Sequence, residues 1–345
     1  MDTMNIQQKL ALLKRNSQEI VTEEELEKLL KEKDQPAVYL GTAITGRPHV
    51  GYFLWVLKMA DFLKCGFKVK LLLADIHGAL DRTPWNVLDK RFEYYSKVIP
   101  AMFEAIGSDI KNFEIIKGSN FQLEKEYVLD MLKMATEATV HDCKKASSDV
   151  VKQVENPKIA GLIYPIMQSL DEQYLSVDVQ YGGIDQRKIL MFAREHLPKL
   201  GYKPRVEFMT PLIPALSKSG KMSASDKTSK IDLIDPPEEV NKKMNAAFCP
   251  EGQTEGNGVL AFCRYVIMTL KQDSADEFII ERPEKWGGNQ AFKTYDELES
   301  AFVKKELHPQ DLKQAVAREI NKLLDPIRNK MENHQELVKE AYPDE

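Results

Sequence analysis

A glycine-rich loop that contains a histidine follows the first short apolar segment of the chain. Residues 37–40 (AVYL) have the composition of a buried strand, and GTAITGRPHVG follows at 41–51, before a helical pattern of apolar residues. Glycines let backbone N–H groups approach an anion, and the N-terminus of a helix adds partial positive charge. A histidine placed there can donate a hydrogen bond to a phosphate oxygen whose charge grows during a displacement. His49 is therefore a candidate catalytic residue, and a plain turn capped by a histidine is the alternative.

A second candidate loop, SKSGKMSASDKTSK at 217–230, is rich in lysine and serine. A mobile loop with one fixed lysine, here Lys221, can close over a triphosphate and release it after reaction. A solvated flexible linker has a similar composition. The apolar Met222 has no place in such a linker, so its presence favours the phosphate-binding interpretation.

A polar stripe lies on one face of the apolar helix predicted at 159–175. Tyr164, Gln168 and Asp171 are spaced i, i+4 and i+7, which puts all three on the same helix face. A purely structural helix would avoid such a stripe, because a buried polar group without a partner is destabilising. The stripe therefore predicts a polar pocket, with a polar network that closes the core as the alternative.

The elements that would position these residues alternate between strand and helix over the first two thirds of the chain. Strand patterns occupy 37–40, 69–75, 113–116, 177–183 and 205–210, of which we expect 205–210 to be the last strand of the protein. Helical patterns occupy 4–33, 52–64, 89–106, 124–154 (two helices that break near His141), 159–175 and 185–197. This alternation predicts an α/β fold with a doubly wound parallel sheet, in which ligands bind where the strand order reverses.

Beyond about residue 230 the pattern becomes nearly all helical, most clearly at 236–248, 258–270 and 311–331. A chain of 345 residues is also too long for one compact core. We therefore expect an N-terminal helical segment at 1–34, an α/β domain at 35–230 and a helical domain at 231–345.

The overall charge excludes general polyanion binding. The chain carries 53 acidic and 48 basic residues and a net charge of −5, so contact with nucleic acid needs a local surface. Four cysteines without paired spacing indicate reduced thiols. The N-terminus is polar and no apolar run reaches the ~20 residues of a membrane span, so we expect a soluble, cytoplasmic protein with no membrane partner.

The two loops together resemble a known pair of motifs. Pro48-His49-Val50-Gly51 is similar to the HIGH motif, and the KMSAS sequence at 221–225 is similar to the KMSKS motif, of class I aminoacyl-tRNA synthetases. From about Val38 to Tyr342 the chain resembles tyrosyl-tRNA synthetases of the archaeal and eukaryotic type. The segments VYLGTAITGRPHVGYF, LIYPIMQSLDEQYL, VQYGGIDQRK, EKWGGN and ELHPQDLK carry this resemblance.

The resemblance implies a fold, a reaction and partners. A Rossmann-type catalytic domain, with a HIGH-like loop at 43–51 and a KMSKS-like loop at 217–230, would precede an all-helical anticodon-binding domain. The enzyme would be a ligase of protein biosynthesis that activates L-tyrosine with ATP and Mg²⁺ to tyrosyl-adenylate. It would then transfer tyrosyl to the 3′-terminal adenosine of tRNA(Tyr). The resemblance also implies a homodimer, with helices around residues 120–155 as a plausible contact.

The resemblance also assigns roles to residues of the catalytic domain. Tyr39 and Asp171 would bind the substrate phenol, and the ammonium group would be held by Tyr164, Gln168 and Gln186. His49 and Lys221 would stabilise the phosphates, and the whole ATP-binding set would comprise Gly41, His49, Gly51, Gly183, Asp185, Lys221, Met222 and Ser223. Cys143, His77 and His141 are expected only to pack or cap.

Four further residues are implied to contact tRNA. Trp286 would stack on an anticodon base, and Asp311, with His308 beside it, would read the first anticodon base. Arg187 would contact the first acceptor-stem pair. The structural alternatives are a buried tryptophan and an aspartate that caps the last long helix.

One position departs from the motif, because Ala224 replaces the second lysine of KMSKS. Lys218, Lys227 or a monovalent cation could supply the missing charge. Two other functions compete with tyrosine activation. A tryptophanyl-tRNA synthetase would need a pocket for an indole N–H, whereas Tyr39 with Asp171 suits a phenol. An inactive synthetase-like RNA-binding protein is disfavoured by the retained His49 and Lys221.

Overall fold

The centre of the protein is a six-stranded sheet. We analysed a computed structural model, which describes residues 4–150, 158–218, 220, 222 and 230–343. The strands are β1 (Glu19–Val21), β2 (Ala37–Thr42), β3 (Lys68–Leu73), β4 (Phe113–Lys117), β5 (Val179–Gly183) and β6 (Val206–Thr210), in the spatial order β1-β6-β5-β2-β3-β4. Strands β2 to β6 pair in parallel, and β1 pairs antiparallel with β6. The chain order reverses between β2 and β5, so a crevice is expected at their carboxyl ends.

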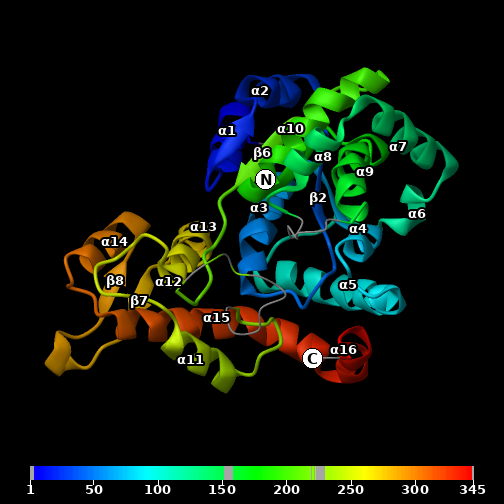
Figure 1. The fold of residues 1–345 in the computed structure, drawn as a ribbon. Helices are drawn as coiled ribbons and strands as arrows, with labels where there is room; N and C mark the ends of the chain where they lie inside the picture. Colours follow the sequence, from blue (N-terminus) through cyan, green and yellow to red (C-terminus); the bar gives the residue numbers. More distant parts are fainter. Residues whose placement is uncertain (1–3, 151–157, 219, 221, 223–229, 344–345) are drawn as a thin grey trace.

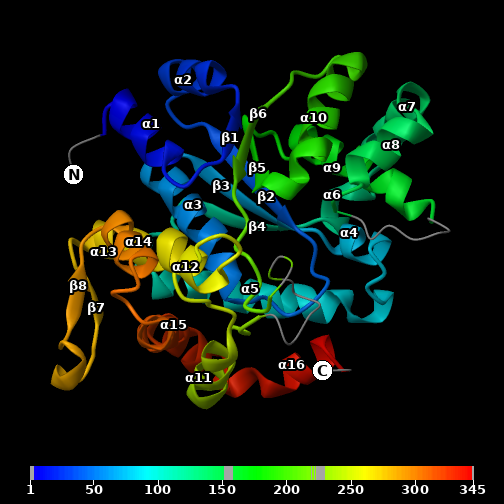
Figure 2. The same cartoon turned by 60° about the vertical axis from the view of Figure 1, so that its left-hand side comes forward.

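Helices cover both faces of this sheet (Figures 1 and 2). The helices of the α/β part are α3 (Phe53–Lys64), α4 (Asp75–Leu80), α5 (Leu88–Ala105), α6 (Ser119–Gln122), α7 (Lys125–Glu137), α8 (Val140–Ser147), α9 (Ala160–Tyr174) and α10 (Arg187–His196). Apolar residues of α3 and α5 join one core cluster with β2, β3 and β6, whereas α7 to α10 form a second cluster. The predicted doubly wound fold is confirmed.

Helix α3 fixes the position of the histidine loop. Its residues are apolar on nearly every side and are buried from Phe53 to Phe62, with the exception of the half-buried Trp55. A short 3₁₀ turn, Val50–Tyr52, precedes it. The helix ends before Gly66, whose φ of 90° is readily adopted only by glycine. The loop at 43–49 is therefore attached to a helix that lies inside the core.

The single helix predicted at 4–33 is wrong. Two helices, α1 (Ile6–Lys14) and α2 (Glu23–Glu32), are separated by β1. Thr22 caps α2 with a reciprocal capping box that involves Glu25. The backbone of β1 finds its hydrogen-bond partners on β6, a contact between residues almost 190 positions apart that helical periodicity does not reveal.

The break predicted in 124–154 is confirmed, and it falls slightly earlier than expected. Helix α7 ends at Glu137, and Thr139 opens α8 with a capping box to Asp142. The predicted break at His141 therefore lies inside the first turn of α8. Residues 151–157 are outside the described part of the chain.

The C-terminal part is mainly helical, as expected, and contains one addition. Its helices are α11 (Pro237–Ala246), α12 (Gly258–Phe262), α13 (Met268–Ser274), α14 (Tyr295–Val303), α15 (Pro309–Met331) and α16 (Gln335–Ala341). A two-stranded antiparallel hairpin, β7 (Phe278–Ile280) with β8 (Gln290–Phe292), lies among them. The expectation that 205–210 is the last strand is therefore wrong, because three-residue strands carry too little alternation to be recognised.

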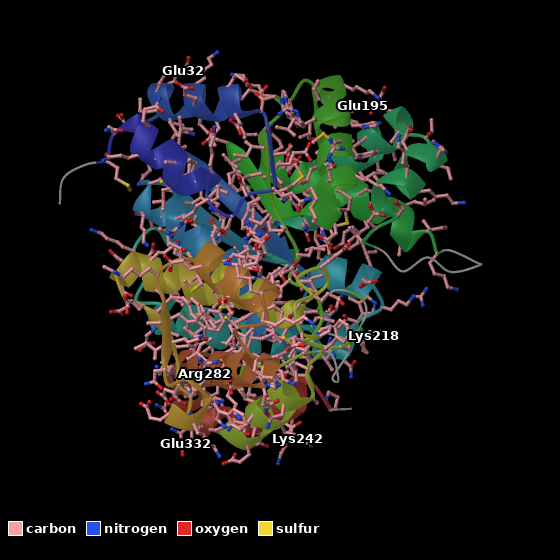
Figure 3. All side chains as sticks on the ribbon, turned by 90° about the vertical axis from the view of Figure 1, so that its left-hand side faces the viewer. Glu32, Glu195, Lys218, Lys242, Arg282 and Glu332 are labelled. Atoms are coloured by element: carbon pink, nitrogen blue, oxygen red, sulfur yellow. The ribbon has the colours of Figure 1, made fainter. Side chains whose placement is uncertain are left out.

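Helices α15 and α16 pack against α5 of the α/β part, as Figure 1 shows. Helix α15 buries one apolar stripe, which consists of Leu312, Val316, Ile320, Leu323, Leu324 and Ile327. Figure 3 shows Glu32 and Glu195 at one end of the molecule, and Lys242, Arg282 and Glu332 at the other. The helical C-terminal part thus continues the core instead of hanging from a linker.

Cys65, Cys143, Cys249 and Cys263 are all buried and free. Within the ranges that the structure describes, none of the helices has the length and hydropathy needed to cross a membrane.

Candidate active site

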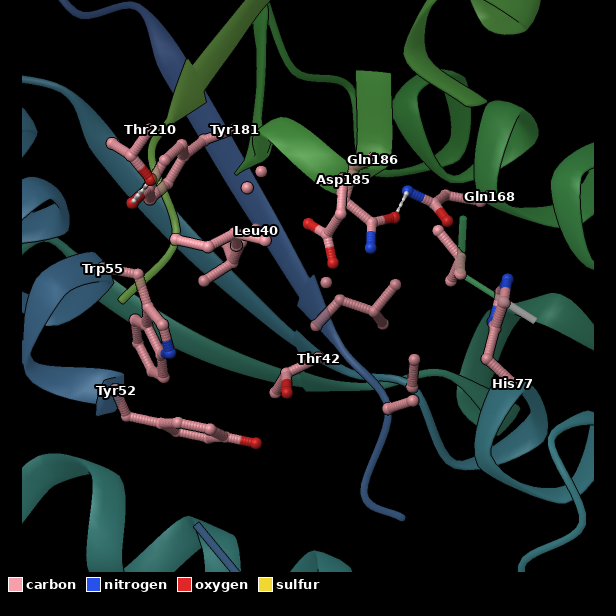
Figure 4. A pocket seen from close by; sticks show the side chains of 18 of the residues that line it. Leu40, Thr42, Tyr52, Trp55, His77, Gln168, Tyr181, Asp185, Gln186 and Thr210 are labelled. Carbon is pink, nitrogen blue, oxygen red and sulfur yellow. Dashed lines mark hydrogen bonds between the residues drawn. The ribbon is translucent and has the colours of Figure 1, made fainter. Parts of the chain in front are cut away.

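A cavity of about 320 Å³ opens where the strand order reverses. Its wall is formed by the carboxyl ends of β2 and β5, by α9 and by the loop that follows β2 (Figure 4). Every described residue that the sequence assigns to the amino-acid and ATP sites lies in this wall, namely Tyr39, Gly41, His49, Gly51, Tyr164, Gln168, Asp171, Gly183, Asp185, Gln186 and Met222. Two distant segments of the sequence therefore meet at one site.

Tyr39 and Asp171, the expected phenol-binding pair, line the deep part of this cavity. Both side chains are almost completely buried, at 0% and 1% exposure. The Tyr39 hydroxyl donates to the backbone oxygen of Gln168 at 3.1 Å. Burial and the nearby carboxyl groups raise the pKa of Tyr39 well above its ordinary value, so its hydroxyl keeps its proton.

Asp171 is held by a network that the sequence analysis missed. Gln122 Nε2 and Tyr127 Oη donate to Asp171 Oδ1 at 2.8 and 2.9 Å. His77 Nε2 lies 3.9 Å from Asp171 Oδ2. Burial raises the pKa of Asp171 to about 8, and the bonds from Gln122 and Tyr127 act against this rise. Because both donors use Oδ1, they leave Oδ2 for a ligand.

His77, expected only to pack or cap, packs beside this network, and the absence of a catalytic role for it stays a prediction. Its ring lines the cavity (Figure 4). It meets the ring of Tyr164 edge-on, with the centroids 4.6 Å apart. Burial lowers the pKa of His77 to about 4, so the ring is neutral at pH 7. The sequence signal that places His77 at the cavity was topological. His77 comes shortly after β3, and β3 pairs with β2 in the sheet. Gln122 and Tyr127 carried no comparable signal.

The polar stripe of α9 faces the cavity, as its spacing predicted. Tyr164, Gln168 and Asp171 all line it, and Gln168 Nε2 donates to Gln186 Oε1 at 3.2 Å (Figure 4). Amide oxygens and a tyrosine hydroxyl are acceptors that suit an ammonium group. Their role in binding one stays a prediction.

His49 both caps a turn and faces the cavity, so the two interpretations of its position are compatible. The backbone N–H of Gly51 donates to His49 Nδ1 at 3.2 Å. Burial lowers the pKa of His49 to about 3, and the charge of Lys230 acts in the same direction. A neutral ring that accepts at Nδ1 carries its proton on Nε2. His49 can thus donate one hydrogen bond without being charged.

The two candidate loops are in contact. Met222 is buried, and an ideal Cβ added at Gly51 would lie 3.2 Å from its Sδ. Immediately after the second loop, Ile231 accepts from the backbone N–H of Val50 at 3.0 Å. Lys230 Nζ donates to the backbone oxygen of Arg47 at 2.9 Å. Lys221, Ser223, Ala224 and Lys227 lie outside the described residues, and Lys218 is exposed.

Two glycines of the cavity wall have no room for a side chain. A Cβ at Gly51 would lie 2.9 Å from His49 Nδ1, and one at Gly183 would lie 2.6 Å from Asp185 Oδ1. Both predicted positions therefore need glycine to keep a neighbouring polar side chain in place. Gly41 differs, since its nearest neighbour would be 3.6 Å away.

The sequence model of the tRNA synthetases class I (W and Y) matches residues 31–325 of the chain. The chain belongs to this family. The synthetase is 44% identical over 343 residues to a tyrosine–tRNA ligase of Haloarcula marismortui, and this match covers 99% of each protein. It is 48% identical over 341 residues to the cytoplasmic tyrosine–tRNA ligase of Gallus gallus, covering 98% of this chain. The synthetase spans only 64% of the length of that Gallus gallus protein.

A solved structure has the same fold. The tyrosyl-tRNA synthetase of Archaeoglobus fulgidus, complexed with L-tyrosine, superimposes with a TM-score of 0.87 at 39% identity. The match covers 95% of this synthetase and 100% of that chain. The Rossmann-type architecture inferred from the two motifs is therefore confirmed.

The tRNA-contacting residues expected from the resemblance lie outside the cavity. Trp286 is 66% exposed, between β7 and β8, so the alternative of a buried tryptophan is wrong. Lys285 Nζ lies 5.5 Å from the centroid of its ring. An exposed indole with a cation above it offers a surface on which a base can stack.

The alternative in which Asp311 caps the last long helix is also wrong. His308 is the cap, and its Nδ1 accepts from the backbone N–H of Gln310 at 3.1 Å. Asp311 lies in the first turn of α15 and is partly exposed. Arg187 is half exposed at the start of α10, and its Nε donates to Glu19 at 2.7 Å. This pairing with Glu19 was not expected.

Proposed function

We propose that this synthetase activates L-tyrosine with ATP to tyrosyl-adenylate and transfers the tyrosyl group to the 3′-terminal adenosine of tRNA(Tyr). The observation that carries the proposal is that Tyr39 and Asp171 line one cavity together with His49 of the first loop and Met222 of the second. The names of the relatives support the same activity.

Buried hydrogen-bonding groups would select tyrosine. The substrate hydroxyl would accept from Tyr39 and donate to Asp171, while its ammonium group would contact Tyr164, Gln168 and Gln186. Phenylalanine would leave Tyr39 and Asp171 without partners in a buried site, and such a loss is strongly unfavourable. An indole N–H would satisfy only one of the two groups, which favours tyrosine over tryptophan.

Activation needs no side-chain nucleophile. A carboxylate oxygen of tyrosine would form a bond to the α-phosphorus, the bond to the pyrophosphate oxygen would break, and pyrophosphate would leave with the electron pair. Positioning and charge stabilisation then supply the catalysis. His49 would donate from Nε2 to a phosphate oxygen, and Lys221, Met222 and Ser223 would close over the phosphates. Gly41, Gly51, Gly183 and Asp185 would accommodate the adenosine.

Mg²⁺ would accompany ATP in this reaction. The described residues contain no group of three histidine, cysteine, aspartate or glutamate side chains arranged to hold a metal. Mg²⁺ prefers phosphate oxygens and water to an all-protein site. A cavity of this kind therefore suits magnesium that arrives bound to the phosphates of ATP. The ion would neutralise charge on the phosphates.

The helical part at 231–345 would bind the anticodon, with Trp286 stacking on a base and Asp311, beside His308, reading the first anticodon position. Arg187 would reach the acceptor stem. These assignments divide the chain into an N-terminal segment at 1–34, a catalytic domain at 35–230 and the anticodon-binding domain. By the name of its relatives, the enzyme would work in the cytoplasm, without a membrane partner.

We further propose a homodimer built through α7, α8 and the start of α9. Large apolar side chains are exposed along this edge, at Leu123, Leu129, Leu132, Val140 and Ile159. Their exposure reaches 73% at Ile159. Exposed apolar side chains mark a protein interface when they join into one patch, and the proposal is that these residues do so.

Pyrophosphate exchange with tyrosine, tryptophan and phenylalanine side by side tests the activity. Tyrosine-dependent exchange, followed by charging of tRNA(Tyr), is the expected result. Exchange that depends on tryptophan would overturn the choice of substrate. Binding of tRNA without formation of any adenylate would instead favour an inactive RNA-binding relative.

A further inference from the structure

A row of buried polar side chains crosses three neighbouring strands behind the cavity. Tyr39 on β2 is in register with Gln180 on β5, and Gln180 is in register with Glu207 on β6. Residues in register on paired strands point to the same face, about 4.8 Å apart. All three are at most 1% exposed. The row therefore leads from the cavity wall, which includes Tyr39 and Gln180, into the core.

Four oxygen atoms around this row have no hydrogen-bond donor. Among the described residues, Gln180 Oε1, Glu172 Oε2 and both carboxyl oxygens of Glu207 are buried without a partner. Glu172 belongs to α9, directly after Asp171. Unpaired buried acceptors are destabilising, and an amide oxygen cannot donate. The cluster itself can supply a donor only if the carboxyl group of Glu172 or of Glu207 carries a proton.

The charged groups around the cluster also favour a retained proton. Burial raises the pKa of Glu172 and of Glu207. The neighbouring acid, Asp171 for Glu172 and Glu172 for Glu207, raises each pKa further. Arg194 and Arg205 act against this rise. The guanidinium groups of these two arginines, however, bond elsewhere. Arg194 pairs with Glu25, and Arg205 donates to the Val177 oxygen and to Gln173 Oε1.

We propose that Glu207 is a protonated positioning residue of the tyrosine pocket: it donates to Gln180 Oε1, so that the Gln180 amide donates to the Tyr39 hydroxyl. Tyr39 then directs its own proton outward, to the Gln168 oxygen in this structure and to the substrate hydroxyl when tyrosine binds. The side chain of Gln180 already acts to lower the pKa of Tyr39, as an amide donor does. The inference rests on the proposed function, because it assumes a phenol in the pocket.

The consequence is a fixed direction of hydrogen bonds through the site. With Tyr39 fixed as the donor, the substrate hydroxyl accepts from Tyr39 and donates to Asp171, which must then be ionised in the complex. A ligand group that cannot both accept from Tyr39 and donate to Asp171 binds more weakly. The specificity of the pocket is thus set in part by a carboxyl group that does not touch the substrate.

Two variants separate this role from simple packing. Glu207→Gln supplies an N–H donor of the same shape and keeps the KM for tyrosine within about two-fold. Glu207→Leu removes the donor and raises that KM by roughly three- to ten-fold, the effect of losing one oriented hydrogen bond, with the KM for ATP unchanged. The inference would be overturned if Glu207→Leu changed the KM values for tyrosine and for ATP equally. It would also be overturned if both variants changed the KM for tyrosine equally.

An infrared measurement keeps the test valid if Glu207→Leu fails to fold. The difference spectrum of wild type minus Glu207→Gln at pH 7 is expected to contain the C=O stretch of a protonated carboxyl group. A difference spectrum that contains the band of an ionised carboxylate and no C=O stretch of a protonated carboxyl group would refute the proposal. If wild type itself lacks tyrosine-dependent exchange, the proposed function fails instead, and the infrared result still decides whether Glu207 carries a proton.

Discussion

The backbone N–H of Gly51 donates to Nδ1 of His49 at 3.2 Å. This one bond fixes the tautomer of a buried, neutral histidine that lines the cavity, so that Nε2 carries the proton. The turn cap and the proposed catalytic donor are therefore the same side chain. The fixed ring also explains why the position two residues after the histidine must be glycine, since a Cβ there would lie 2.9 Å from the imidazole.

Replacing Gly51 by alanine should reproduce the defect of His49→Ala. The new Cβ displaces the imidazole, and losing one donor to a developing charge typically lowers kcat by about 10²–10³. Pyrophosphate exchange measures the loss of kcat, and the equilibrium binding of tyrosine should be unchanged. Gly78→Ala is the matched control, because its Cβ meets nothing closer than 3.6 Å. A fully active Gly51→Ala variant would contradict the role of His49.

Tyr127→Phe should impair tyrosine binding, whereas Tyr174→Phe should not. The hydroxyl of Tyr127 donates to Asp171, and that of Tyr174 donates to Asp130 at 2.9 Å. Each change removes one bond to a carboxyl group and should lower the free energy of unfolding by about 1–3 kcal/mol. Only the first frees Asp171 to move. Urea unfolding and the KM for tyrosine, measured for both variants, test this, and identical KM values would count against the network.

The buried, neutral His77 should contribute a loss of stability in acid, opposite in sign to the contribution of buried acids with raised pKa values such as Asp171. The pKa of His77 is lowered to about 4 from an ordinary 6.5, so between these values the unfolded chain binds more protons at this residue than the folded one. The contribution of His77 to the free energy of unfolding therefore decreases as the pH falls from 6.5 to 4, by on the order of 3 kcal/mol. His77→Gln should remove this contribution, so the change in the free energy of unfolding between pH 7.5 and 4.5, measured in urea, should differ from that of the wild type by this amount. A change equal to that of the wild type would show that His77 is not buried in its neutral form.

Leu132→Lys should convert the proposed dimer to a monomer. A charged group in the centre of an apolar interface is desolvated without a partner and is strongly unfavourable. Val303→Lys, at a similarly exposed position on α14, is the control and should leave the assembly intact. Sedimentation velocity at micromolar concentration distinguishes the two outcomes. A wild-type monomer would rule out the proposed interface altogether.

Trp286→Ala should weaken binding of tRNA(Tyr) without affecting adenylate formation. Loss of one base stacked on an aromatic ring reduces binding by about 1–3 kcal/mol. Trp85→Ala is a close control, because Trp85 is 67% exposed and Trp286 66%. The comparison uses the Kd for tRNA at fixed salt, with pyrophosphate exchange as the second measurement. Equal losses in both variants would argue against specific stacking.

Much of the site could be predicted from local sequence, because helical spacing and short motifs act over a few residues. The spacing of Tyr164, Gln168 and Asp171 placed them on one face of α9. The glycines beside His49 predicted a loop at the ligand-binding edge of the sheet, and Gly41, His49 and Gly51 do line the cavity. The alternation of strands and helices predicted the doubly wound sheet, since each apolar strand must be covered on both faces.

Only the tertiary structure decided which other residues complete the site. Gln122 and Tyr127 reach Asp171 across more than 40 positions of sequence, and β1 finds its partner on β6. Local patterns contain no information on such pairings, because these contacts depend on how the strands are ordered in the sheet. The row Tyr39, Gln180 and Glu207 exists for the same reason: strand register, set by the packing of the whole sheet, aligned three polar side chains that nothing in their sequence neighbours connects.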